Sequence, residues 1–405
     1  MLWMLCAAFA IDVPLNNATT IFQPDDFPNQ IRAVPDLDGD GLDELAVGTY
    51  SSFNLKLSTH PGIFPTWMFN GNPQVADVNG DGQMDLALGE ATWGGDQGRI
   101  DFFLGPLQAG IIPAPTVSIV GDSGDYVGGL FTPLADADGD GMPEWAIAIN
   151  QPAAASAYVM VASSAALGWA LTQPTREIRV TPLMPEQPQL WWKVSLSAPV
   201  DYLFPGGDLD ADGQEELLIP LLQRGLIFQG WASLPRANAG SVREANATAL
   251  TYPVDTEIIS TTLDVSGDGL PDVVANNFDT VWVRYGNPAL QGRGTIRLSG
   301  GLTWQRSGGY VDHAAVIPDP SGAGTAWLAY RFDARWAGPD TWISAAPFPT
   351  GQVVGQRNLR AQVRVVNTPL IESLDFWTSA ELDGDPAAEF VVAVRDRGLP
   401  TISSF

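Results

Sequence analysis

The sequence has few of the residues that cross-link or catalyse. Its 405 residues include one cysteine, two histidines and two lysines. A single cysteine excludes a framework of disulfide bonds. His60 and His313 stand far apart, and neither belongs to an HExxH motif or accompanies a nucleophile elbow. With 20 basic against 46 acidic residues, the net charge is −26, which argues against nucleic acid or an anionic membrane surface as a partner.

Long apolar runs are also scarce. The opening stretch MLWMLCAAFA ends in the small-x-small pattern of a signal-peptidase site, and its roughly ten residues are too few to span a bilayer. We predict that residues 1–10 are a signal peptide and residues 11–405 a single domain. The alternative is that residues 1–10 are retained as a frayed apolar N-terminus or as a buried strand. No other segment is suited to cross a membrane, so we expect a secreted, periplasmic or cell-surface protein that is not transmembrane.

Glycine and proline are, by contrast, abundant, with 42 and 32 residues. Such a composition is typical of a fold with many turns. Short apolar runs such as ELAVGT, DLALGE, EWAIAI and DVVAN have the length of buried strands, and no long amphipathic helix pattern accompanies them. The sequence therefore predicts an all-β protein.

One acidic pattern recurs along the chain. The five strong copies are DLDGDGLDEL, DVNGDGQMDL, DADGDGMPEW, DLDADGQEEL and DVSGDGLPDV, which begin at Asp36, Asp77, Asp136, Asp208 and Asp264. Two weaker copies, DPSGAGTAWL and ELDGDPAAEF, begin at Asp319 and Glu381. We number these copies loops 1 to 7 in chain order. Each loop leads into an apolar strand.

The spacing of the acids predicts a cage of oxygen ligands. Two carboxylates 4 Å apart repel by about 4 kcal/mol at an effective dielectric constant of about 20, so a cation between them is favoured. Side chains at positions 1, 3 and 5, the carbonyl at position 7 and the carboxylate at position 9 form a hard, flexible set that favours Ca²⁺ over Mg²⁺ or transition metals. The predicted ligands of the five strong loops are Asp36, Asp38, Asp40, Leu42 and Glu44; Asp77, Asn79, Asp81, Gln83 and Asp85; Asp136, Asp138, Asp140, Met142 and Glu144; Asp208, Asp210, Asp212, Gln214 and Glu216; and Asp264, Ser266, Asp268, Leu270 and Asp272.

The two late loops depart from the pattern. Loop 6 has Ala323 and Trp327 at positions 5 and 9, so we expect a turn without metal. Loop 7 keeps its acids, but Pro386 replaces the glycine at position 6 and cannot adopt a positive φ. A sixth calcium site therefore stays open as a possibility. Its ligands would be Glu381, Asp383, Asp385, Ala387 and Glu389.

An EF-hand begins in the same way but needs a bidentate acid at position 12, followed by a helix. Here position 12 is apolar and lies within a predicted strand, which excludes the EF-hand. The residues at that position are Val47, Leu88, Ile147, Ile219 and Ala275. If the acids only capped turns, no carboxylate would be needed at position 9. Every strong loop has one there, which favours a metal site.

The repeat predicts the fold. Units of about 60 residues with several short strands indicate blades of a β-propeller. One strand precedes each loop, one follows it, and a third comes later, as in RIDFFLG and AYVMVA. Seven loops predict seven blades. Residues 17–24 could supply the outer strand that the last blade lacks. We therefore predict that an N-terminal strand closes the ring. The predicted fold is a seven-bladed β-propeller with calcium-binding loops.

These loops resemble the FG-GAP repeats of integrin α-chain propellers and the related VCBS-type repeats of bacterial surface proteins, and the resemblance covers most of the chain. The stretch YVGG at 126–129 is the nearest match to the phenylalanine-glycine pair of that family. The resemblance implies that the loop ligands bind structural Ca²⁺ between the first two strands of a blade. It also implies that a partner binds on the opposite face.

We therefore expect a non-catalytic, calcium-stabilised adhesion or interaction module, monomeric, which binds a protein or glycan on the face opposite the calcium loops. A carbohydrate-binding lectin is the alternative, with Trp93, Trp191 and Trp304 as candidate aromatic platforms. An enzyme that acts on polysaccharides, as a lyase or hydrolase, is disfavoured because the sequence shows no catalytic motif.

Overall fold

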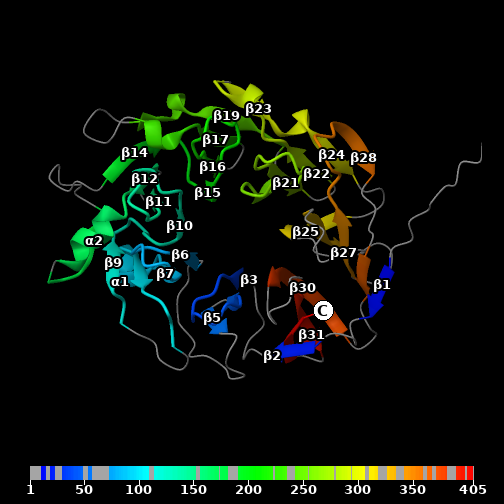
Figure 1. The fold of residues 1–405 in the computed structure, drawn as a ribbon, viewed down its shortest axis with the longest axis horizontal. Coiled ribbons are helices and arrows are strands. Elements are labelled where there is room, and N and C mark those ends of the chain that lie inside the picture. Colours follow the sequence, from blue (N-terminus) through cyan, green and yellow to red (C-terminus); the bar gives the residue numbers. More distant parts are fainter. Residues whose placement is uncertain are drawn as a thin grey trace, which may run out of the picture.

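The computed structural model consists mostly of strands, with a few short helices (Figure 1). The residues that it describes are 11–14, 19–22, 30–48, 53–56, 73–108, 114–151, 156–172, 174–180, 190–221, 224–234, 242–253, 255–277, 280–292, 294–305, 310–317, 326–333, 342–358, 363–366, 371–380, 389–396 and 399–404. The prediction of an all-β protein is confirmed. The predicted signal peptide, residues 1–10, lies outside the described residues.

The described strands form seven sheets that follow the chain around a ring (Figure 1). In each sheet the first strand lies nearest the middle of the ring, and the next strands pair with it and with each other in antiparallel order. The first four sheets, from inner to outer strand, are β3 (Gln30–Val34), β4 (Glu44–Gly48) and β5 (Phe53–Lys56); β6 (Gln74–Ala76), β7 (Asp85–Glu90), β8 (Arg99–Phe103), β9 (Val117–Val120) and β13 (Glu177–Arg179); β10 (Leu130–Pro133), β11 (Trp145–Gln151), β12 (Ser156–Ala162), β14 (Leu190–Leu196) and β18 (Val242–Arg243); and β15 (Phe204–Pro205), β16 (Leu217–Leu221), β17 (Arg224–Phe228), β19 (Thr248–Thr251) and β23 (Thr295–Arg297).

The other three sheets have the same order. They are β20 (Glu257–Ser260), β21 (Val273–Asn277), β22 (Thr280–Arg284), β24 (Leu302–Gln305) and β28 (Gly355–Asn358); β25 (Tyr310–Ile317), β26 (Trp327–Asp333), β27 (Trp342–Pro347), β29 (Val363–Val366) and β1 (Ile11–Pro14); and β30 (Ile371–Ala380), β31 (Glu389–Asp396), β32 (Leu399–Ser404) and β2 (Thr19–Phe22). The helices are α1 (Trp93–Asp96) and α2 (Ala165–Leu171), with single 3₁₀ turns at η3 (Trp231–Ser233), η5 (Glu244–Asn246), η6 (Pro288–Leu290) and η7 (Leu298–Gly300).

Neighbouring sheets are interlocked by exchanged strands. The connection between the third and fourth strands of one sheet returns to the sheet before it and adds a fifth, parallel strand at its outer edge. In this way β13 pairs with β9, β18 with β14, β23 with β19 and β28 with β24. The exchange covers outer edges that would otherwise expose unpaired backbone groups.

The N-terminal segment continues this exchange across the ends of the chain. β1 adds in parallel to β29 of the sixth sheet, as the other exchanged strands do. β2 then pairs in antiparallel order with β32 and becomes the fourth strand of the seventh sheet. The prediction that a strand from residues 17–24 closes the ring is confirmed, and β1 is an additional link that the sequence did not indicate.

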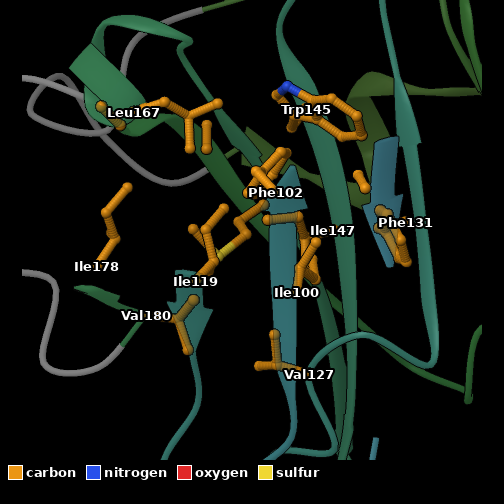
Figure 2. Packing of buried hydrophobic residues seen from close by; sticks show 14 of the residues in the cluster. Ile100, Phe102, Ile119, Val127, Phe131, Trp145, Ile147, Leu167, Ile178 and Val180 are labelled. Atoms are coloured by element: carbon orange, nitrogen blue, oxygen red, sulfur yellow. The ribbon is translucent and has the colours of Figure 1, made fainter. Parts of the chain in front are cut away.

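Apolar side chains fill the spaces between neighbouring sheets. Between the second and third sheets, Phe102 on β8 packs edge-on against Trp145 on β11, with ring centroids 5.0 Å apart (Figure 2). Both side chains are almost fully buried. Because these sheets are covered on both faces, their middle strands read as continuous apolar runs, as in LLIPL of β16, where every residue is buried.

The stretch YVGG packs against the second sheet just before the first strand of the third sheet begins. Gly128 has a φ of 90°, a conformation that residues with a Cβ rarely adopt. A Cβ atom built on Gly89 would lie 2.0 Å from the carbonyl oxygen of Gly128, so neither glycine has room for a side chain. Within the described residues, no helix is long and apolar enough to cross a membrane.

Removal of residues 1–22 should lower the melting temperature and promote aggregation, because the outer edges of β29 and β32 lose their partners. The matched control begins at Ile11 and keeps both strands. Differential scanning calorimetry and light scattering of the two chains measure the effect. Equal melting temperatures would contradict a role for β1 and β2 in closing the ring.

Candidate metal centres

The five strong loops all connect the first strand of a sheet to the second. Neighbouring loops lie side by side: a Cβ atom built on Gly39 of loop 1 would lie 3.5 Å from the side chain of Gln83 in loop 2, and one built on Gly80 of loop 2 would lie 3.4 Å from Met142 in loop 3. The position 1 aspartate organises each loop. In loop 1, Asp36 accepts hydrogen bonds from the amides of Gly39, Asp40 and Gly41 at 2.7, 3.0 and 2.8 Å. Asp77, Asp136 and Asp264 accept the equivalent three bonds.

The position 6 glycines have the predicted left-handed conformation. The φ angles of Gly41, Gly82, Gly141, Gly213 and Gly269 lie between 84° and 91°. Position 4 is also left-handed, which was not predicted although a glycine stands there in four of the five strong loops. Loop 4 has Ala211 at position 4, with a φ of 59°.

The side chains at positions 1, 3 and 5 converge in several loops. In loop 1, oxygens of Asp36, Asp38, Asp40 and Glu44 all lie within 4.8 Å of one another. The same separation holds for Asp136, Asp138 and Asp140 of loop 3, and for Asp208, Asp210 and Glu216 of loop 4. The structure thus brings together carboxylates that the sequence analysis assigned to one site.

Loops 2 and 5 are arranged differently, because neutral side chains occupy position 3. In loop 2 the amide of Asn79 donates to Asp81 at 2.9 Å. In loop 5 the hydroxyl of Ser266 donates to Asp264 at 3.2 Å, and Gln352, distant in sequence, donates to Asp268 at 2.7 Å. One oxygen of the position 5 aspartate is therefore bonded to a neutral donor in both loops.

The carboxylate at position 9 is fully buried in each strong loop and ties the loop to its sheet. Glu144 accepts a hydrogen bond from the Ala137 amide at 2.7 Å, and the other loops have the same bond to the amide of position 2. In loops 2, 4 and 5 the second oxygen accepts from a glycine amide just after the third strand, from Gly105, Gly230 and Gly286.

Some buried carboxylate oxygens have no such donor. Oε1 of Glu144 and both carboxylate oxygens of Asp210 are buried and have no partner within normal hydrogen-bond geometry. The Asp212 amide lies close enough to Asp210 to lower its pKa, but burial and the neighbouring Asp212 and Asp208 carboxylates raise it. A buried, unpaired carboxylate oxygen is costly unless a cation or proton satisfies it. The carboxylate oxygens of loops 3 and 4 therefore fit a hard cation.

Burial raises the pKa of four of the position 9 carboxyls. The pKa is about 8 for Glu216, about 7 for Glu144 and Asp272, and about 6 for Asp85. Neighbouring loop carboxylates raise these values further, and the backbone donors only partly offset the effect of burial. Without a cation, these four groups hold protons much more tightly than ordinary carboxyls.

Two of the position 1 carboxyls behave in the opposite way. Burial alone would raise the pKa of Asp136 and Asp264, but the amides of positions 4, 5 and 6 donate to the ionised form and lower both pKa values. Loops 3 and 5 therefore each contain an ionised carboxylate at position 1 beside a position 9 carboxyl whose ionisation is unfavourable.

Loops 6 and 7 lie outside the described residues at 318–325 and 381–388. The prediction of a metal-free turn in loop 6 and the possible sixth site, from Glu381 to Ala387, stay predictions. Glu389 is the first residue of β31. His60 also lies outside the described residues, and His313 lies within β25.

No family model matches the chain, and no curated protein matches it. Among solved structures, the chain is similar to BBS1N, determined in complex with ARL6DN, with a TM-score of 0.51, 8% identity and 96% of each chain covered. It also matches a lectin of Agrocybe aegerita that recognises terminal N-acetylglucosamine (TM-score 0.46, 12% identity, 94% of this chain and 91% of that one). A third match is the β-propeller domain of Cps50 (Swd1) from Myceliophteria thermophila (TM-score 0.45, 12% identity, 96% and 99%).

The ring of sheets in Figure 1 and the likeness to BBS1N decide the fold. The chain is a β-propeller. At these identities the likeness concerns the fold alone.

The propeller buries one of the three tryptophans that were candidate platforms for a sugar. Trp304 is only 7% exposed and stacks on Phe348. Trp93 is partly exposed, with the guanidinium of Arg99 5.0 Å from its ring centroid. Trp191 lies in β14, and the adjacent Trp192 is fully buried and donates to the carbonyl of Trp231.

In a chelator, the free energy of unfolding should fall as the pH rises from about 5 to about 9. The folded pKa values of Glu216, Glu144 and Asp272 lie above those of the unfolded chain, so their contribution is complete below the unfolded pKa and is lost as the pH passes about 7 to 8. Urea unfolding at several pH values measures this loss. Glu216→Gln should reduce the loss near pH 8; stability that rises with pH would contradict the assignment.

Proposed function

We propose that the protein is a calcium-stabilised β-propeller that acts as a non-catalytic interaction module, with calcium in a structural role. The observation that supports it most strongly is the convergence of carboxylates in loops 1, 3 and 4 together with the unpaired buried oxygens of Glu144 and Asp210. Carboxylate and carbonyl oxygens in a flexible loop are the ligands that Ca²⁺ prefers.

The carbonyls at position 7 complete the proposed cages. In loops 1, 3 and 5 the residues are Leu42, Met142 and Leu270, whose amides donate to the position 5 carboxylates at 2.9 to 3.0 Å. This bond turns the backbone at position 7 back toward the loop. Loops 2 and 5 would bind with fewer charged ligands, since Asn79 and Ser266 replace aspartate, and we therefore expect weaker sites there.

A structural role follows from where the acids lie. Each position 9 carboxylate is bonded to the backbone of its own loop, and in three loops also to the end of the third strand. A cation at that point would join the loop to the sheet. General acids and bases need access to a substrate, whereas these carboxylates are fully buried.

The proposed cellular context follows from the resemblance to FG-GAP and VCBS-type repeats. A secreted, periplasmic or surface protein meets calcium concentrations that suit weak, structural sites. We propose that such a protein works as a monomer and presents the face opposite the acidic loops to a protein or glycan partner.

Calcium should raise the melting temperature of the full chain relative to chelator. A single site contributes about 2.7 kcal/mol when free calcium is 100 times its Kd. Asp136→Ala should remove part of this gain, because Asp136 organises loop 3 through three backbone hydrogen bonds. The measurement is scanning calorimetry with calcium, with magnesium and with chelator.

Asp122→Ala is the matched control. Asp122 is half exposed and belongs to no acidic loop, and among the described residues its side chain makes only a long ion pair of 3.9 Å with Arg179. Its substitution should leave the calcium response unchanged. Equal melting temperatures of the unmutated protein in calcium and in chelator would overturn the structural role of calcium.

A further inference from the structure

A pocket of about 220 Å³ lies at the start of three neighbouring inner strands. β6, β10 and β15 come from the second, third and fourth sheets and face the middle of the ring (Figure 1). The residues that line it include Gln74, Leu130, Thr132, Tyr202, Leu203 and Phe204. Each strand runs on from the pocket into its acidic loop, so the pocket lies toward the face opposite the proposed calcium sites.

An aromatic platform forms one side of this pocket. Tyr202 is 44% exposed, one of the few large apolar side chains in the described residues with that exposure. Its ring stacks on Phe204, with centroids 5.9 Å apart and planes 28° apart. Leu203 between them is buried and anchors the segment. The tyrosine is thus held in place with part of its side chain exposed to solvent.

The polar groups of the pocket are uncharged. The polar lining residues carry an amide (Gln74), a hydroxyl that donates to the Pro133 carbonyl at 3.4 Å (Thr132) and a phenol (Tyr202), and none of the lining residues that the structure describes is acidic or basic. This neutrality stands out in a chain of net charge −26. An anionic ligand would find no partner for its charge and would be repelled by the molecule as a whole. A cation would likewise find no carboxylate in the lining. The chemistry of the pocket suits a neutral ligand with both a polar edge and an apolar face.

The volume limits the ligand to a single ring. Pockets for drug-sized molecules span roughly 300 to 1,000 Å³, and this one is smaller. A pyranose has the required properties, since its C–H face packs on an aromatic ring and its hydroxyls bond to amides and hydroxyls. We propose that this pocket binds one neutral hexopyranose residue of a glycan, stacked on Tyr202. This inference rests on the proposed interaction module and names its ligand class.

The test uses the full chain in calcium, with methyl glycosides of glucose, galactose and mannose as probes and glucuronic acid as the charged comparison. Saturation-transfer NMR and titration calorimetry measure binding, for which a Kd on the order of 1 mM is expected for so small a ligand. Tyr202→Ala should weaken binding at least tenfold, whereas Tyr202→Phe, which keeps the ring, should retain most of it.

Val354→Ala is the matched control, because Val354 is 69% exposed and does not line the pocket. It should bind as the unmutated protein does. Binding that Tyr202→Ala leaves unchanged, or glucuronic acid bound as well as the neutral sugars, would overturn the proposal.

Absence of binding by every neutral sugar, in protein whose melting temperature still rises with calcium, would overturn the sugar site and leave the calcium-stabilised module standing. Loss of the calcium response alone would instead overturn the structural role of calcium. A peptide that binds in a Tyr202-dependent way, where sugars do not, would replace the glycan by a protein partner.

Discussion

The exchange of strands between neighbouring sheets is the constraint on which the rest of the structure depends. A single sheet of this protein is apolar on both faces and cannot bury its surface alone. Each exchanged strand ties a sheet to the one before it, and the N-terminal strands β1 and β2 carry the same exchange across the two ends of the chain. The apolar layers between sheets, such as that of Phe102 and Trp145, form where neighbouring sheets pack face to face.

The acidic loops add an electrostatic cost to this scaffold. Their carboxylates lie within 4.8 Å of one another in three loops, while position 9 is buried against the sheet. Backbone amides stabilise the ionised aspartate at position 1, but they do not reach every buried oxygen, as Glu144 and Asp210 show. The same carboxylates that strain an empty loop would bind a hard cation, which is why stability and calcium are expected to be linked in this protein.

Most of the fold could be predicted because its signals are local. The position 6 glycines predict a left-handed turn, and the apolar run after each loop predicts the second strand, so β4, β7, β11 and β21 lie where ELAVGT, DLALGE, EWAIAI and DVVAN stand. The site was predictable in part. Convergence of Asp36, Asp38 and Asp40 follows from their spacing, but the bond from Gln352 to Asp268 joins residues 84 positions apart and has no local signal.

By itself the sequence determined the acidic turns, the strands that follow them and the chain's strong negative charge, because these depend on residues a few positions apart. Only the tertiary structure decided which exchanged strands cover which edges, which tryptophans are buried and where Tyr202 meets Gln74 and Thr132. The reason is physical: short, degenerate segments such as β13 and β18 have no pairing preference of their own, and their partners are set by the packing of whole sheets around the ring.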